Sequence, residues 1–110
     1  MLAYRHDGEK GLNEMKGSEK QITWAQVLYN RLYAGYQCIE AKLATEEADA
    51  WKGAYEYGQR LLDIYSKETL SWVLIDDLKK LSVDPEKCAK QIRYMYYKNL
   101  KLYEQKAEED

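Results

Sequence analysis

The chain has 110 residues, of which 45% are hydrophobic and 33% are charged, with a single proline. This length is enough for one small globular domain and too short for two independent cores. Seventeen basic and nineteen acidic residues leave a net charge of −2. That balance speaks against a strongly cationic nucleic-acid binder and against an extremely acidic tail protein.

Membrane and disulfide signals are weak in this sequence. The longest apolar run, from Trp72 to Ile75, is far below the roughly 18 residues that a membrane-spanning helix needs. The first residues lack the apolar stretch of a secretory signal, so we expect a cytoplasmic protein that does not enter a membrane. Cys38 and Cys88 are fifty positions apart with no CxxC pair, which predicts reduced thiols rather than a zinc site or a disulfide framework.

The amino-terminal residues differ in composition from the remainder. Residues 1–20 hold three of the six glycines and eight charged residues, which predicts a flexible polar arm. A helical domain is expected over 21–106, followed by an acidic, frayed tail over 107–110. From about Thr23, apolar residues recur at the spacing of a long amphipathic helix. They are Trp24, Leu28, Leu32, Tyr36, Ile39 and Leu43.

Two further helices are predicted in the middle of the chain. Thr45 followed by two glutamates is typical of a helix start, and the inner face of this second helix includes Trp51 and Gly58. Ser66 is a candidate cap for a third, short helix that is apolar nearly all round. Trp72 and Ile75 lie away from its leucine stripe, so they are predicted to contact a partner. Asp77 falls within that stripe and should lie near a helix end or meet a basic residue.

The fourth helix has the clearest start signal. Asp84 is expected to cap it, Pro85 to be its first residue, and Val83 to pack against Cys88. No segment shows the period-two alternation of a strand, and the links between helices are short. The sequence therefore predicts an all-α fold, a compact bundle of four or five helices with antiparallel neighbours.

Residue patterns of enzymes are missing from the sequence. The single histidine, His6, lies beside Asp7 in the predicted arm, and neighbouring carboxylates such as Asp76 and Asp77 diverge around a helix. The sequence has no phosphate-binding loop, GxSxG turn or dinucleotide fingerprint. We therefore expect a non-enzymatic protein with no catalytic residues, no metal, no cofactor and no small-molecule substrate.

The outward face of the last helix combines basic and tyrosine side chains. Residues 79–106 carry eight basic against three acidic residues, whereas residues 40–78 carry four against nine. Cations can follow a phosphate backbone while tyrosine rings stack on unpaired bases, so single-stranded nucleic acid is one candidate partner. Lysines that only keep a helix soluble, or that contact a protein, explain the pattern as well. The candidate nucleic-acid-binding residues are Lys87, Lys90, Arg93, Tyr94, Tyr97, Lys98 and Lys101.

Tyrosine supplies most of the aromatic content, with eleven tyrosines and no phenylalanine. They are spread around the first and last helices, so they cannot all face one core, and tyrosine is enriched at protein interfaces. Tyr33, Tyr94 and Tyr97 are therefore candidate interface residues beside Trp72. The opposite charges of the two segments also allow copies of the chain to associate head to tail, as an oligomer.

Two segments carry a family resemblance. The stretches NRLYAGY at 30–36 and QIRYMYYKNLKLYEQK at 91–106 resemble the small helical subunits of type III CRISPR effector complexes, which act in antiviral defence. This resemblance implies a non-catalytic subunit that stacks in a ribonucleoprotein filament and lines the path of a nucleic-acid strand. Two functions stay open: a subunit, adaptor or inhibitor acting through protein contacts, and a nucleic-acid-binding subunit.

Overall fold

The structure is a computed structural model that describes residues 15–109, with side chains described for residues 15–100. It confirms the all-α prediction with four helices. Within the described residues the only extended pairing is a single bridge between Lys16 and Leu70. The helices are α1 (Glu19–Lys42), α2 (Ala48–Lys67), α3 (Ser71–Leu78) and α4 (Pro85–Glu109).

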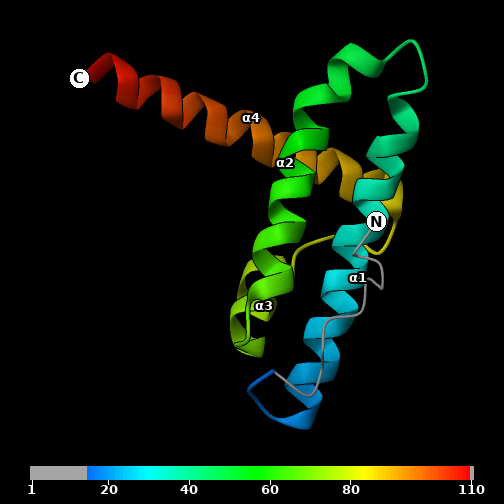
Figure 1. The fold of residues 1–110 in the computed structure, drawn as a ribbon, viewed down its shortest axis with the longest axis vertical. Helices are drawn as coiled ribbons and strands as arrows, with labels where there is room; N and C mark the ends of the chain where they lie inside the picture. The colour runs from blue at the N-terminus through cyan, green and yellow to red at the C-terminus, as the bar shows by residue number, and fades with distance from the viewer. Residues whose placement is uncertain (1–14, 110) are drawn as a thin grey trace.

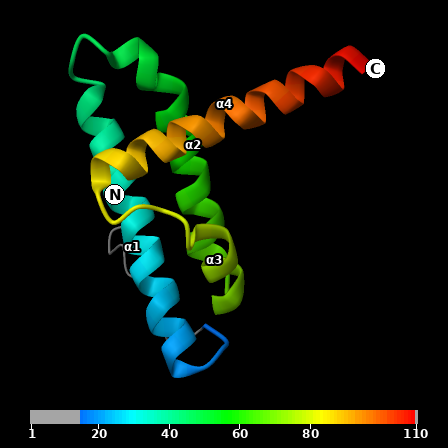
Figure 2. The same ribbon diagram turned by 180° about the vertical axis from the view of Figure 1, so that it is seen from behind.

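Helices α1 and α2 lie side by side and run in opposite directions, with α3 beside the end of the pair where α1 begins (Figure 1). Helix α4 does not line up with them. It crosses the pair and then extends away from the other helices, as the view from behind also shows (Figure 2). The expected antiparallel arrangement therefore holds for α1 and α2, while the C-terminal part of α4 stands apart from the body (Figures 1 and 2).

The prediction of a flexible arm over residues 1–20 is wrong for residues 15–20, and residues 1–14 lie outside the described residues. Met15 is 7% exposed, and the backbone of Lys16 pairs with that of Thr69 and Ser71 at 2.7 and 3.0 Å. Gly17 has a φ of 137°, a conformation that favours glycine. Ser18 then caps α1 with a reciprocal pair of hydrogen bonds to Gln21, so this helix begins four residues before Thr23.

The core is formed where α1 meets the other three helices. Leu28, Leu32 and Ile39 are completely buried, as the sequence pattern predicts. Tyr29 is also buried, at 1% exposure, whereas Trp24 is 46% exposed. The predicted position of Trp24 on the inner stripe is therefore wrong, and Tyr29 replaces it as the large aromatic group of the core.

Close packing of α1 on α4 depends on one glycine. A Cβ atom on Gly35 would lie 2.5 Å from Cys88 Sγ, 3.0 Å from Cys88 Cβ and 3.2 Å from Ile92 Cδ1. Because Gly35 lacks this atom, the two helices approach closely enough for Cys88 and Ile92 to be completely buried. This contact sets the position of the first half of α4 on the body.

The links on either side of α2 follow the predicted signals only in part. Thr45 accepts a hydrogen bond from the backbone of Glu47, just before α2 begins. Ser66 does not cap the third helix, because α2 continues through it to Lys67 and its hydroxyl donates to Asp63 O. Asp77 is the second-last residue of α3, so it lies near a helix end as predicted, and it accepts a hydrogen bond of 2.8 Å from the hydroxyl of Tyr65.

The start of α4 confirms the cap but not the predicted apolar contact. Asp84 Oδ1 accepts from the backbone N–H of Glu86 at 3.0 Å, and Pro85 is the first helical residue. Val83 is 72% exposed while Cys88 is buried, so the predicted pairing of these two is wrong. The helix runs to Glu109, so the tail predicted over 107–110 is helical over its first three residues.

Candidate interaction surface

The residues predicted to bind nucleic acid divide into two groups on α4. Lys87, Lys90 and Lys98 are exposed, and so are Tyr94 and Tyr97, at 65% and 51%. At about 100° per residue these five side chains share the side opposite the buried Cys88 and Ile92. We refer to these five residues as the outer face of α4. Lys101 lies in the same helix, but its side chain is outside the described residues.

Arg93 does not belong to the outer face. Its guanidinium carbon lies 4.0 Å from the centre of the Trp51 ring, and Lys42 Nζ lies 5.1 Å from the same ring. Trp51 is only 2% exposed, so these cations lie against a ring that is shielded from water. Contact between Arg93 and nucleic acid therefore stays a prediction, while in this structure the guanidinium packs on the Trp51 ring. Its role is to hold α4 against α2 through a cation–π contact.

A second set of contacts fixes the same region of α4. The Cys38 thiol donates to Glu86 Oε2 at 2.7 Å, and Lys42 pairs with the other carboxylate oxygen at 3.4 Å. Both hydrogen bonds lower the pKa of Glu86. Burial, together with the bond to Glu86, raises the pKa of Cys38 to about 11, and burial raises that of Cys88 to about 11 as well. Both free cysteines are therefore protonated, weakly nucleophilic thiols near neutral pH.

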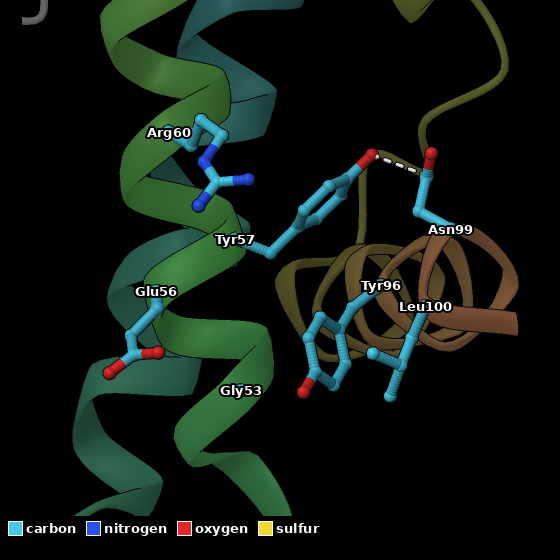
Figure 3. Close-up of a pocket in the computed structure, with 7 residues that line it drawn as sticks. All are labelled: Gly53, Glu56, Tyr57, Arg60, Tyr96, Asn99 and Leu100. Atoms are coloured by element: carbon cyan, nitrogen blue, oxygen red, sulfur yellow. Dashed lines mark hydrogen bonds between the residues drawn. The ribbon is translucent and has the colours of Figure 1, made fainter. Parts of the chain in front are cut away.

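An open pocket of about 280 Å³ lies in the corner where α4 leaves α2 (Figure 3). The Tyr57 and Tyr96 rings meet at 6.2 Å and 55°, and Asn99 Nδ2 donates to the Tyr57 hydroxyl at 2.8 Å. Burial raises the pKa of Tyr57, which keeps this phenol protonated. The corner therefore offers aromatic surface and hydrogen-bonding groups. Its lining residues are Gly53, Glu56, Tyr57, Arg60, Tyr96, Asn99 and Leu100.

A larger open pocket, of about 440 Å³, lies on the other flank of α4, beside the connection from α3. Gln91 joins that connection to α4, because its amide nitrogen donates to Lys80 O at 2.9 Å and its oxygen accepts from Ser82 N at 2.7 Å. We name this the Lys80–Tyr94 pocket. Its lining residues are Asp77, Lys80, Leu81, Lys90, Gln91, Tyr94 and Met95.

The sequence reveals only part of this second pocket. Lys90 and Tyr94 are predicted site residues, whereas Lys80, Leu81 and Met95 are not. The signal that would have found them is the polar Gln91, placed where a helix flank meets a short connection. Its double hydrogen bond brings residues about ten positions apart in the sequence to one side of α4.

Trp72, Ile75 and Tyr33, three of the residues predicted to lie at a protein interface, do not form one exposed surface. Trp72 is 46% exposed on α3, as predicted. Ile75 is half-buried against the core, and so is Tyr33, whose ring stacks on Tyr36 at 6.2 Å. Trp72 alone of these three presents a large exposed surface, and the exposed tyrosines of α4 lie on a different helix.

The described residues contain no cluster that could bind a metal ion. Over residues 15–109 no group of three or more histidine, cysteine and carboxylate side chains is placed to bind a metal ion. His6 and Asp7 lie outside those residues. In the same range, none of the helices has both the length and the apolar character needed to cross a bilayer.

Comparisons with known proteins add no assignment. A scan of protein families, a search of curated proteins and a search of solved structures each found no match to this chain.

Proposed function

We propose that this chain is a non-enzymatic interaction protein that binds a protein partner through the outer face of α4. The observation that carries this proposal is the exposure of Tyr94 and Tyr97, at 65% and 51%, on a helix that extends away from the body (Figures 1 and 2). Tyrosine offers a large apolar ring with a polar end, and it is enriched at the centres of protein interfaces. Two such rings on one helix face are typical of a docking surface.

The charges beside these rings support the same function. Among the described residues, Lys87, Lys90 and Lys98 have no ion-pair partner. Arg93, by contrast, lies against the Trp51 ring of α2. A partner with acidic groups would therefore meet three available ammonium groups around two tyrosines, which favours specificity and fast association.

The shape of α4 gives a further reason. Most of the stability of a helix in a protein comes from packing one of its faces, and Leu100 is still 41% exposed where α4 leaves the body. A partner on the outer face and in the corner beside Leu100 would supply such packing. The free thiols of Cys38 and Cys88 favour a reducing compartment, so a cytoplasmic location is part of this proposal.

The test is the size of the native complex in an extract of cells that make the protein. We expect the protein to elute well above its mass of 13.0 kDa, and the double variant Tyr94→Ser and Tyr97→Ser to elute as the free chain. The purified double variant should unfold at the same temperature as the parent, because both side chains are exposed. Elution of both proteins at the same position would contradict the proposal.

Single-stranded RNA is the second candidate partner, favoured by the placement of two exposed tyrosines among three exposed lysines on the outer face. In this case the chain would act as a small subunit of a ribonucleoprotein, as the resemblance to type III CRISPR subunits implies. The test is fluorescence anisotropy of a labelled single-stranded RNA at rising salt. Binding that falls steeply with salt, and that is lost in Lys90→Glu and Lys98→Glu, would support RNA. Unchanged binding in this variant would exclude the outer face as the RNA site.

A further inference from the structure

The Lys80–Tyr94 pocket combines an apolar floor with a basic rim. Leu81 is 7% exposed and Met95 is half-buried, and both line the pocket. Tyr94 stands at its side with 65% of its surface exposed. The Lys80 and Lys90 side chains are exposed and also line it. An occupant therefore finds an apolar seat with ammonium groups around it.

The walls of this pocket are fixed before anything binds. Gln91 holds the connection after α3 against α4 through its bonds to Lys80 O and Ser82 N. Arg31 adds a bond of 3.4 Å from α1 to Leu81 O. Leu81 and Met95 also pack with the hydrophobic core. A pocket that needs little rearrangement loses less free energy on binding, which favours specific recognition over accidental contact.

The charge of the pocket favours an anionic occupant. Within the described residues, neither Lys80 nor Lys90 forms an ion pair, whereas the neighbouring Lys79 pairs with Asp76. Lys90 also lies near enough to Glu86, which is outside the pocket, to lower the pKa of that carboxyl group. The one carboxylate among the lining residues, Asp77, accepts a hydrogen bond from Tyr65. Two available cations against one hydrogen-bonded carboxylate leave a positive rim around the apolar floor.

We propose that the Lys80–Tyr94 pocket binds an acidic peptide segment of the partner, with one bulky apolar side chain seated against Leu81, Met95 and Tyr94. Aspartate or glutamate residues on either side of that side chain would pair with Lys80 and Lys90. This inference rests on the proposed function and names the chemistry that the protein partner must present. It also assigns one flank of α4 as the anchor point, because a buried apolar side chain contributes more to affinity than exposed ion pairs.

The same pocket is poorly suited to a nucleic-acid base. Leu81 and Met95 offer no hydrogen-bond donor to the edge of a base. The amide of Gln91, the one amide side chain among the lining residues, already bonds through both its nitrogen and its oxygen. A base could reach the donors of Lys80, Lys90 and Tyr94 only at the rim, whereas the apolar floor would leave its inner edge atoms unpaired, which weakens binding. RNA binding would therefore use the outer face generally and not this pocket.

The test uses fluorescence polarisation with three labelled heptapeptides and the full chain. The first has a central phenylalanine between aspartate and glutamate residues, the second has serine in place of the phenylalanine, and the third has lysine in place of every acidic residue. We expect the serine peptide to bind roughly tenfold more weakly, since one apolar side chain is lost, and the lysine peptide not to bind. Equal binding of the phenylalanine and serine peptides would overturn the proposal that this pocket seats an apolar side chain.

A pair of matched charge reversals locates the site. Lys80→Glu with Lys90→Glu changes two lining residues, whereas Lys87→Glu with Lys98→Glu makes the same change of net charge at outer-face positions outside the pocket. We expect the first pair to weaken binding of the phenylalanine peptide by roughly thirtyfold or more and the second by less than about threefold. Circular dichroism checks that both variants remain folded.

The outcomes separate this inference from the proposed function. Equal losses in the two double variants would overturn the pocket and leave the outer face as a general binding surface for acidic proteins. If no peptide binds at low salt while the complex in extracts still depends on Tyr94 and Tyr97, the proposal for the Lys80–Tyr94 pocket is overturned and the proposed function stands. If no peptide binds and the Tyr94→Ser and Tyr97→Ser double variant elutes at the position of the parent, the pocket proposal and the proposed function are both overturned.

Discussion

The position of α4 depends on the close approach of α1 at Gly35, and this gives a quantitative prediction for Gly35→Ala. The new Cβ would lie 2.5 Å from Cys88 Sγ and 3.0 Å from Cys88 Cβ, whereas carbon atoms in contact prefer separations of about 3.5–4.0 Å. Overpacking costs about 1–3 kcal/mol, and a separation of 2.5 Å between Cβ and Sγ places this site in the upper part of that range, at about 2–3 kcal/mol. Replacing glycine by alanine in a helix returns about 1 kcal/mol.

The expected net loss for Gly35→Ala is about 1–2 kcal/mol of unfolding free energy, or roughly 5–15 °C in melting temperature for a domain of this size. Urea denaturation followed by circular dichroism measures it, with Gln37→Ala as an exposed control on the same helix that should change stability little. Adding Cys88→Ala removes the closest atom, so the double variant should be about 1 kcal/mol more stable than the sum of the single effects. A Gly35→Ala protein as stable as the parent would refute the close packing of α1 on α4.

Three further predictions concern contacts that shape the same body. Arg93→Met removes the cation 4.0 Å from Trp51, so the unfolding free energy should fall by about 1 kcal/mol, and an unchanged urea midpoint would argue against the cation–π contact. Gly17→Ala should speed amide exchange at Lys16, because the bond from Lys16 N to Thr69 O depends on the positive φ of Gly17; exchange at the parent rate would contradict this. Burial raises the pKa of Cys38 and Cys88 from 9.0 to about 11, so these thiols ionise at lower pH in the unfolded chain than in the folded one. The unfolding free energy should therefore be highest below pH 9 and fall as the pH rises to 11. Urea titrations at pH 7 and 10 measure this decline, and it should be smaller in a variant lacking both thiols.

The elements of this fold follow from local signals in the sequence. Asp84 and Pro85 mark the start of α4, because a capping carboxylate and a residue without an N–H satisfy the first turn. The apolar periodicity locates α1 and α2 because a helix is stabilised by burying one face. These requirements are local, so one sequence is enough to predict them.

The errors and the unpredicted contacts come from features that depend on how the helices cross. Three steps of four residues, from Trp24 to Tyr36, turn about 120° around a helix, so a stripe with this spacing moves off the buried face and leaves Trp24 exposed. Arg93 is adjacent to Ile92, at the edge of the buried face, and only the crossing of α4 over α2 places Trp51 beneath it. Such placements are tertiary, and periodicity within one helix does not contain them.

The candidate surface divides in the same way. The exposure of Tyr94, Tyr97 and the outer lysines follows from helical geometry and is confirmed. The Lys80–Tyr94 pocket depends on the path of the connection between α3 and α4, which Gln91 fixes through two hydrogen bonds across the sequence. Residue spacing within α4 gives no information about that path.

The central claim is that a protein partner covers the outer face of α4, and site-specific photo-crosslinking tests it most directly. The measurement replaces Tyr97 by p-benzoylphenylalanine in cells that make the protein, with the same substitution at the exposed Asp63 on α2 as the control. If a protein partner covers the outer face, a discrete protein adduct forms at position 97 and none at position 63. No adduct at position 97, equal adducts at both positions, or an adduct at 97 that ribonuclease removes would contradict the claim.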